Sequence, residues 1–227
     1  MAVKVTWVRY GPSALLFRFA DKVNETAFAR GRAIARMLEE HAPPGLIEFV
    51  PAFTSVLLEF DPRLVPDVTA IAADLANKLE RIGRTKLRPA PIKEIPIRYD
   101  GPDLARVAEL HKLTVKEVCE LHARPVYKVY ALGFSPGFPY LGDLNPRLHT
   151  PRLAVPRPRV RAGAVAIGGE HTGIYTVDGP GGWNILGHTP PTIFDPARGQ
   201  AAGQEIEMFL LRPGDQVKFV PVAKPSD

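Results

Sequence analysis

The segment ALGFSPGFPYLG, residues 131–142, opens the part of this 227-residue chain that is richest in turns. It contains Gly133-Phe134-Ser135-Pro136-Gly137, a match to the G-x-S-x-G pattern of a serine nucleophile elbow. Such an elbow needs a helix after the serine, and the next residue must offer its backbone N–H to the oxyanion hole. Pro136 has no N–H, and the proline- and glycine-rich continuation cannot begin a helix. The segment therefore predicts a rigid aromatic turn rather than a catalytic serine.

From about residue 125 onward the sequence is typical of short strands separated by turns, because glycine and proline interrupt every apolar run. The predicted strands are YKVYALGF (127–134), RAGAVAIGG (161–169), HTGIYTV (171–177), WNILGH (183–188) and DQVKFVPV (215–222). Many short strands with dense turns indicate a β-barrel or a sandwich.

The first 88 residues differ, because strand-like and helix-like segments alternate there. The strands are expected at 3–10, at 14–20 and, broken near Pro51, within 46–60; the helices are expected at 23–41 and 64–82. The order β-α-β-β-α with one extra strand in front suggests a small ferredoxin-like or related α+β domain.

A proline-rich stretch at 87–96 predicts the boundary between an α+β domain (1–88) and a mainly β domain (89–227). IKEIPIRY (92–99) follows as a strand. Two short helices are expected within 102–123, and Thr114 with Glu117 fits a capping box for the second one.

The composition is that of an ordinary globular protein, with 45% hydrophobic and 23% charged residues and a net charge of +5. This mild positive charge does not indicate a nucleic-acid binder. The single cysteine, Cys119, excludes an internal disulfide framework, and no Cys/His cluster has zinc spacing, so no metal is expected. We find no signal peptide, no apolar run of membrane-spanning length, no P-loop and no dinucleotide fingerprint. The sequence predicts a cytoplasmic protein.

A family resemblance rests on glycine- and proline-rich motifs that occur in order at close spacing. They are GFSPGFPYLGDLNPRLHTPR (133–152), VPRPRVRAGAVAIGGEHTGIYTVDGPGGWNILGHTP (155–190), FDP (194–196) and RPGDQVKF (212–219). With these motifs the chain resembles the KipI / allophanate hydrolase subunit 1 family, many of whose members are B-type subunits of 5-oxoprolinase (PxpB). The resemblance extends over essentially the whole chain.

The resemblance implies a cyclophilin-like β-barrel as the C-terminal domain. It also implies an ATP-dependent 5-oxoprolinase, which opens the lactam of 5-oxo-L-proline to glutamate. The partners would be a KipA/PxpC-type subunit and a PxpA (LamB/YcsF)-type subunit. Two alternatives stay open: a KipI-like inhibitor of a sensor histidine kinase, and one half of the carboxyltransferase of a biotin-dependent urea or allophanate pathway enzyme. Prolyl isomerisation would rest on fold analogy alone.

The chain departs from the usual pattern of the family at four positions. The family usually has proline, serine, glutamine and proline where this chain has Arg161, Ala164, His171 and Thr176. None of these changes breaks the glycine-rich framework. His171 makes a substrate contact at that position less certain and adds a titratable group.

An arginine-rich run gives the first candidate site. Arg147, Arg152, Arg157, Arg159 and Arg161 lie in a stretch without acids, and guanidinium groups bind carboxylate or phosphate bidentately. Arg152 and Arg157 belong to the family's TPR and PR motifs and are the preferred anion ligands. The alternatives are a solvated surface and a contact with a partner subunit.

Two glycine-rich segments give the second candidate site. Gly168 and Gly169 precede His171 and Tyr175, and in the other segment Gly181 and Gly182 precede Trp183 and His188. Glycines let a ligand approach the backbone closely. The two histidines are candidate general acids or bases, and the other residues are candidate substrate contacts. The alternatives are hairpins with surface histidines and a tryptophan of the core.

The aromatic turn itself gives a third candidate. Phe134, Phe138 and Tyr140, with Pro136 and Gly137 between them, would form a pocket edge or a contact with a partner. If the loop folds inward, the aromatic residues belong to the core.

Overall fold

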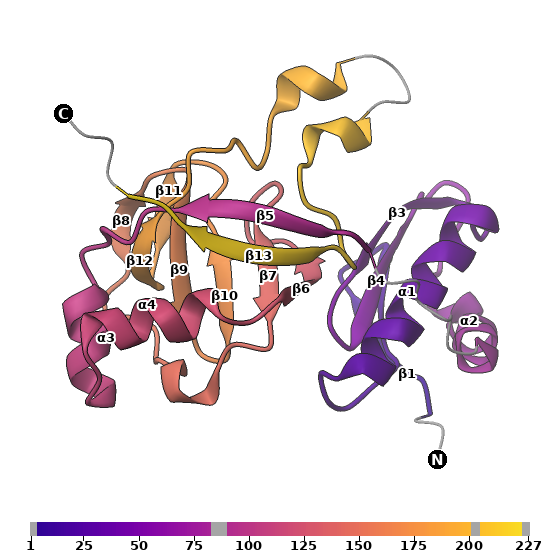
Figure 1. Cartoon of the computed structure of the whole chain (residues 1–227). Helices are drawn as coiled ribbons and strands as arrows, with labels where there is room; N and C mark the ends of the chain where they lie inside the picture. The colour runs from indigo at the N-terminus through magenta and orange to yellow at the C-terminus, as the bar shows by residue number, and fades with distance from the viewer. Residues whose placement is uncertain (1–3, 83–89, 201–204, 224–227) are drawn as a thin grey trace. The chain divides into compact units, whose positions relative to one another are not determined.

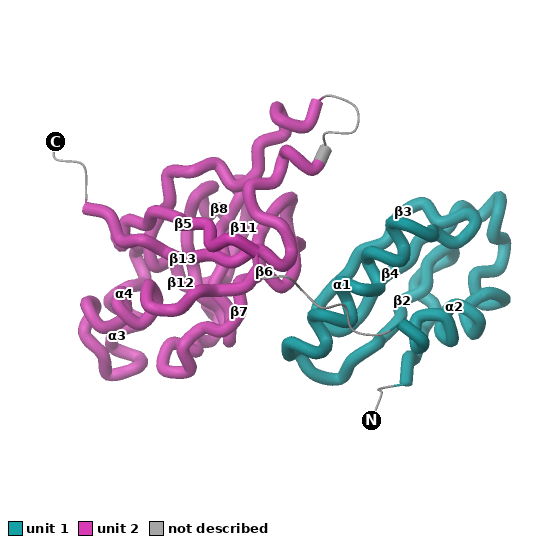
Figure 2. Tube along the Cα trace, turned by 45° about the vertical axis from the view of Figure 1, so that its right-hand side comes forward, with its two compact units in different colours: residues 1–88 teal, residues 89–227 magenta. Residues whose placement is uncertain are grey.

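The computed structural model describes residues 4–82, 90–200 and 205–223. The chain divides into two compact units, residues 1–88 and 89–227, each with its own hydrophobic core (Figure 2). Part of the proline-rich stretch at 87–96 lies outside the described residues. The independence of the two domains stays a prediction.

The first unit is a four-stranded antiparallel sheet with two helices, which agrees with the predicted mixture of helices and strands. Its elements are β1 (Thr6–Tyr10), β2 (Ala14–Arg18), α1 (Glu25–Glu40), β3 (Leu46–Pro51), β4 (Ser55–Phe60) and α2 (Thr69–Arg81). The strand order is β1-β2-β4-β3, so β1 is the edge strand beside β2.

Alternation along the strands explains how this sheet is covered. Leu15 and Phe17 of β2 point to one face, where they form one buried cluster with Ile34 of α1 and Leu79 of α2. Both helices therefore pack on the same face of the sheet. Helix α2 begins five residues later than predicted, because the segment ahead of it contains Pro66, which disfavours the helical region for the residue before it.

The second unit is built around a seven-stranded sheet that curls into a barrel (Figure 1). Its strands are β5 (Ile92–Ile97), β6 (Tyr127–Leu132), β7 (Pro139–Gly142), β9 (Ala164–Gly168), β10 (His171–Ile174), β12 (Asn184–His188) and β13 (Gln216–Pro221). Their order is β12-β9-β10-β7-β6-β13-β5; β5 and β13 are parallel, and the other neighbours are antiparallel.

A short seam joins the two edge strands, β5 and β12. The backbone N–H of Arg98 donates to the carbonyl of His188, and the N–H of His188 donates to the carbonyl of Arg98, both at 2.9 Å. The carboxylate of Asp100 contacts the side chains of both residues. The sheet is therefore nearly closed. The prediction of a β-barrel is confirmed in that the seven strands form a barrel-like sheet.

Two helices pack together at one end of the barrel, α3 (Leu104–His111) and α4 (Val115–Ala123) (Figure 1). The predicted capping box is present, since the Glu117 N–H donates to Thr114 Oγ1 at 3.2 Å and the Thr114 N–H donates to Glu117 Oε2 at 2.8 Å. Within the described ranges, none of the helices is long and apolar enough to cross a bilayer.

Several short elements were not predicted. Residues 139–142, assigned to the aromatic turn, form strand β7, because a proline is tolerated at the first position of a strand. The arginine run contributes β8 (Arg157–Val160), which pairs with β11 (Gly179–Gly181) in a two-stranded ribbon. The remaining short elements are the 3-10 turns η1 (Pro146–Leu148), η2 (Pro196–Gly199) and η3 (Glu205–Met208).

Candidate functional site

The candidate site is a cavity of about 310 Å³ on the outer face of the barrel. Alternation along β9 defines this face: Val165 and Ile167 point into the barrel core, whereas Ala164 and Ala166 join a second cluster on the other side of the sheet. The residues that line the cavity are Phe134, Phe138, Tyr140, Arg152, Leu153, Pro156, Tyr175, Pro180, Gly181, Gly182 and Trp183.

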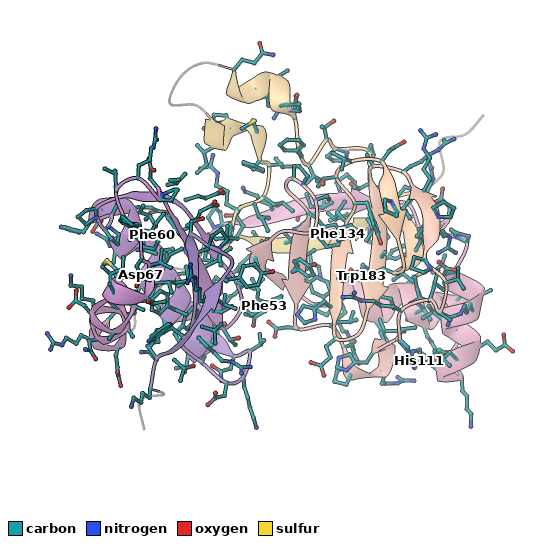
Figure 3. The ribbon with its side chains drawn as sticks, turned by 180° about the vertical axis from the view of Figure 1, so that it is seen from behind. Phe53, Phe60, Asp67, His111, Phe134 and Trp183 are labelled. Carbon is teal, nitrogen blue, oxygen red and sulfur yellow. The ribbon has the colours of Figure 1, made fainter. Side chains whose placement is uncertain are left out.

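Phe138 is the centre of the aromatic wall. It is buried and meets four rings edge to face, with centroid separations of 5.5 Å to Phe134, 5.1 Å to Tyr140, 5.3 Å to Tyr175 and 5.4 Å to Trp183. Edge-to-face contacts bring the positive edge of one ring to the negative face of another, which fixes both orientations. The wall is therefore a preformed surface. Figure 3 shows Phe134 and Trp183 over the strands of the barrel.

Three glycines give these rings the space they occupy. A Cβ on Gly168 would lie 2.8 Å from the Trp183 ring, and one on Gly173 would lie 2.7 Å from Cζ of Phe138. A Cβ on Gly181 would overlap the hydroxyl of Tyr175. The glycine pattern of the sequence thus lets aromatic rings lie against the backbone of the barrel.

Gly181→Ala tests this role of glycine in the pocket. We expect the variant to lose about 1–3 kcal/mol of unfolding free energy, because the added methyl group must displace the Tyr175 ring. Gly179→Ala in the same strand is the matched control, since a Cβ there meets nothing within 4 Å. Urea unfolding of the two variants gives the comparison, and equal midpoints would contradict the expectation.

Phe134 forms the rim of the pocket in an unusual backbone conformation. Its φ is +67°, a left-handed value that is uncommon outside glycine, and 64% of the residue is exposed. Two bonds of the turn hold it there: the Gly133 N–H donates to the Phe138 carbonyl, and the Phe138 N–H donates to the Ser135 carbonyl, both at 3.1 Å. The Ser135 hydroxyl lies 3.4 Å from the Thr176 hydroxyl, and among the described residues no histidine is hydrogen-bonded to it.

The arginine run does not form one anion site, because acids from distant segments pair with its members. Arg157 forms an ion pair with Asp103 at 2.7 Å, and Arg159 pairs with Asp178 at 2.6 Å. Asp103 also accepts the backbone N–H of Ile185 at 2.7 Å, so the Arg157 pair ties the ribbon to the barrel. Of the two preferred anion ligands, only Arg152 lines the pocket.

Arg152 is the single charged side chain among the lining residues that the structure describes. Its guanidinium carbon lies 5.9 Å from the centre of the Trp183 ring, a cation–π arrangement. No described carboxylate pairs with it. Burial raises the pKa of Tyr140 and the pKa of Tyr175, so both hydroxyls are neutral near pH 7. The pocket is thus apolar with one positive charge at its edge.

The two candidate catalytic histidines lie at opposite ends of β9 and outside the lining of the pocket. His171 pairs with Gly168 at one end and His188 pairs with Ala164 at the other. The ring of His171 lies 6.4 Å from that of Tyr140, and burial lowers the pKa of His171. The Nδ1 atom of His188 is 3.0 Å from Asp100 at the barrel seam. A shared catalytic role for the pair is therefore not supported by this geometry.

Four other candidates serve the framework around the pocket. Gly168 lies under Trp183, and Gly169 forms the β9–β10 turn with φ +60°. The Pro136 carbonyl accepts a 2.6 Å hydrogen bond from the Thr176 hydroxyl, and Gly137 packs against Phe194. None of the four lines the cavity.

A second cleft of about 730 Å³ lies between α4 and β13, and Arg147 of the arginine run lines it. Its lining carries both signs of charge. The acids are Glu117 and Glu120, and the cations are Lys116, Arg124, Arg147 and Lys218. The start of α4 is already capped by the carboxylate of Glu117. Neither of these two clefts has a glycine-rich loop at a helix N-terminus, which is one common cradle for the phosphates of a nucleotide. Among the described residues no group of three or more His, Cys, Asp or Glu side chains is placed to hold a metal ion.

Comparison with known proteins identifies the family. A family model described as "Carboxyltransferase domain, subdomain C and D" matches residues 5–203. The B-type subunit of 5-oxoprolinase from Bacillus subtilis (strain 168) is 37% identical over 236 residues, which cover 99% of this chain and 95% of that protein. The chain belongs to the family of B-type 5-oxoprolinase subunits.

Solved structures agree with this family assignment. TTHA0988 matches with a TM-score of 0.78 and 42% identity over 94% of this chain, and the chain spans 41% of its length. The Kluyveromyces lactis urea carboxylase matches with a TM-score of 0.79 and 23% identity, over 97% of this chain and 22% of that one. That second likeness shows that this family shares its fold with a domain of urea carboxylase.

Proposed function

We propose that the chain is the B-type subunit of an ATP-dependent 5-oxoprolinase and acts with partner subunits of the A and C types. The observation that carries this proposal is the similarity to the B-type subunit from Bacillus subtilis over 95% of that protein's length. In the reaction, water adds to the lactam carbonyl carbon of 5-oxo-L-proline. The ring C–N bond then breaks, and the nitrogen becomes the amino group of glutamate.

A lactam is a stable amide, and ATP hydrolysis to ADP and phosphate would supply the free energy to open it. We assign ATP to a partner subunit, because the sequence has no P-loop and neither of the two clefts of the second unit described above has a glycine-rich loop at a helix N-terminus. The pocket holds one cation and two neutral phenols but no paired nucleophile and base. The chain therefore contributes to binding and depends on its partners for the chemistry.

We also propose closer fold relationships for the two units. The sheet order β1-β2-β4-β3 is that of a ferredoxin-like unit in which the edge strand comes from the start of the chain rather than from its end. The nearly closed seven-stranded sheet is compatible with the cyclophilin-like barrel that the family resemblance implies.

Reconstitution tests the proposed function. The purified chain is mixed with its A- and C-type partners, 5-oxo-L-proline and ATP, and glutamate is measured. We expect glutamate to form only when all three subunits are present. A rate that does not change when this chain is left out would reject the proposal.

A second candidate function is one half of a biotin-dependent carboxyltransferase. The match to the carboxyltransferase model over residues 5–203 and the shared fold with urea carboxylase favour it. Carboxyl transfer from carboxybiotin to urea, measured with the same subunits, separates it from lactam hydrolysis. Inhibition of a histidine kinase stays a prediction from the family resemblance, and a kinase autophosphorylation assay addresses it.

A further inference from the structure

We propose that the aromatic pocket of the second unit binds the substrate acid of the complex, with the carboxylate on Arg152 and the ring against Phe138 and Trp183. This inference rests on the proposed function and assigns its substrate to a place in this chain. The pocket would hold the five-membered lactam while a partner subunit delivers the phosphate and the water.

The charge of the pocket selects an anion. Arg152 is its one charged lining residue, no acid lies among the described residues that line it, and Arg152 has no described carboxylate partner. Its guanidinium carbon lies 5.9 Å from the centre of the Trp183 ring, and a guanidinium group can form two parallel hydrogen bonds with a carboxylate. An amine would meet only repulsion from Arg152.

The neighbouring arginines show why this guanidinium differs from the others. Arg157 and Arg159 are on the adjacent ribbon strand β8, and each already has an aspartate within 2.7 Å. Their charge is compensated inside the chain. Arg152 precedes β8 in the segment over Trp183, and its charge is available to a ligand.

The size and walls of the pocket select a small flat ring. A volume of about 310 Å³ is at the lower end of the range for small-molecule sites, roughly 300–1,000 Å³. This volume is too small for a nucleoside triphosphate. The edge-to-face rings around Phe138 fix the walls before a ligand arrives, so little ordering of side chains opposes binding. A lactam ring packs against such aromatic faces.

The tyrosines complete the polar contacts. Tyr140 and Tyr175 carry hydroxyls at the pocket wall, and because burial raises the pKa of each, they stay protonated. A protonated phenol can donate its O–H to a carbonyl oxygen such as that of a lactam. Neutral tyrosines also leave the Arg152 charge uncompensated.

Arg152→Gln in the reconstituted complex is the test. Loss of the charged hydrogen bonds is expected to raise KM for 5-oxo-L-proline about 10- to 100-fold, with kcat changed less than about threefold. Arg152→Lys keeps the charge but loses the planar fork, so its KM is expected between those of the other two proteins. Arg159→Gln on the ribbon is the matched control, and its KM should equal that of the wild type.

A second measurement separates substrate binding from a structural role. Isothermal titration calorimetry reports binding of 5-oxo-L-proline to the complex without ATP. 5-Oxo-L-prolinamide, in which a neutral carboxamide replaces the carboxylate, should bind to the wild-type complex only weakly. Its affinity should be the same for the Arg152→Gln complex.

The outcomes distinguish this proposal from the proposed function. If glutamate formation requires the chain but Arg152→Gln has the wild-type KM and binds substrate normally, the pocket proposal is overturned and the function stands. If omission of the chain leaves the rate unchanged, the function fails. In that case, binding of 5-oxo-L-proline that depends on Arg152 would still support the pocket proposal. Absence of such binding would overturn the pocket proposal together with the proposed function.

Discussion

Gly187→Ala is expected to open the barrel of the second unit and to lower its unfolding free energy by about 3 kcal/mol or more. A Cβ on Gly187 would overlap the carbonyl oxygen of Arg98 and lie 3.1 Å from the Cα of Tyr99. Both obstacles are backbone atoms, so no rotamer change relieves the overlap. The strand must move, and the two 2.9 Å hydrogen bonds between Arg98 and His188 are lost with it.

Urea unfolding and amide hydrogen exchange measure this effect. The Arg98 and His188 amides should exchange rapidly in Gly187→Ala, whereas amides in the interior strand β6 should stay protected. Gly179→Ala is the control for the intrinsic cost of replacing a glycine, because a Cβ there has open space. A Gly187→Ala protein with wild-type stability and slow exchange at the seam would contradict the expectation, because the seam would then accommodate a side chain at position 187.

Much of the fold follows from periodicity, because strands and helices are local patterns. The alternation in 14–20 predicts β2, and the amphipathic spacing in 23–41 predicts α1. The pairing of strands could not be predicted, since it depends on residues far apart. The seam between Arg98 and His188 joins positions 90 residues apart, as their numbers show, and no local signal marks either one.

The candidate site was predictable where its residues are neighbours in the sequence. Phe134, Phe138 and Tyr140 lie in one segment and Trp183 in another, and their glycine-rich surroundings indicated close packing. The charges were not predictable. The arginine run has no acid nearby in sequence, and Asp103, which compensates Arg157, comes from the start of a helix 54 positions away. Only the folded chain shows that Arg152 lines the aromatic pocket without a described carboxylate partner.

A buried histidine inside the barrel was also missed, because nothing local distinguishes His122 from a surface histidine of a short helix. It is completely buried, and its ring stacks near Phe219 with a centroid separation of 4.7 Å. The Thr172 hydroxyl donates to the Ala166 carbonyl at 3.0 Å, so it must accept from Nε2–H of His122, 2.9 Å away. The Tyr99 hydroxyl then donates to Nδ1 at 2.7 Å. The neutral ring is fully hydrogen-bonded.

This histidine should make the protein unstable in acid. Burial lowers the pKa of His122 to about 3, against 6.5 in an unfolded chain. Between these values only the unfolded state takes up the proton, so stability is complete above pH 6.5 and falls as the pH falls. The slope approaches about 1.4 kcal/mol per pH unit below pH 6.5, which gives about 2.3 kcal/mol between pH 6.5 and 4.5.

The double variant Tyr99→Phe/His122→Phe isolates this contribution, since it removes the titrating ring together with the hydroxyl that would otherwise lose its partner. Its stability at pH 7 should be lower than that of Tyr99→Phe, but its loss between pH 6.5 and 4.5 should be smaller by about 2–3 kcal/mol. Other groups that titrate in this window, such as His111 and His171, are present in both proteins and cancel in the difference. Urea unfolding at a series of pH values gives the two slopes. Parallel slopes would mean that His122 takes up its proton inside the folded barrel. Because Tyr99 and Thr172 both depend on the neutral ring, such a protonated state would require the network to rearrange.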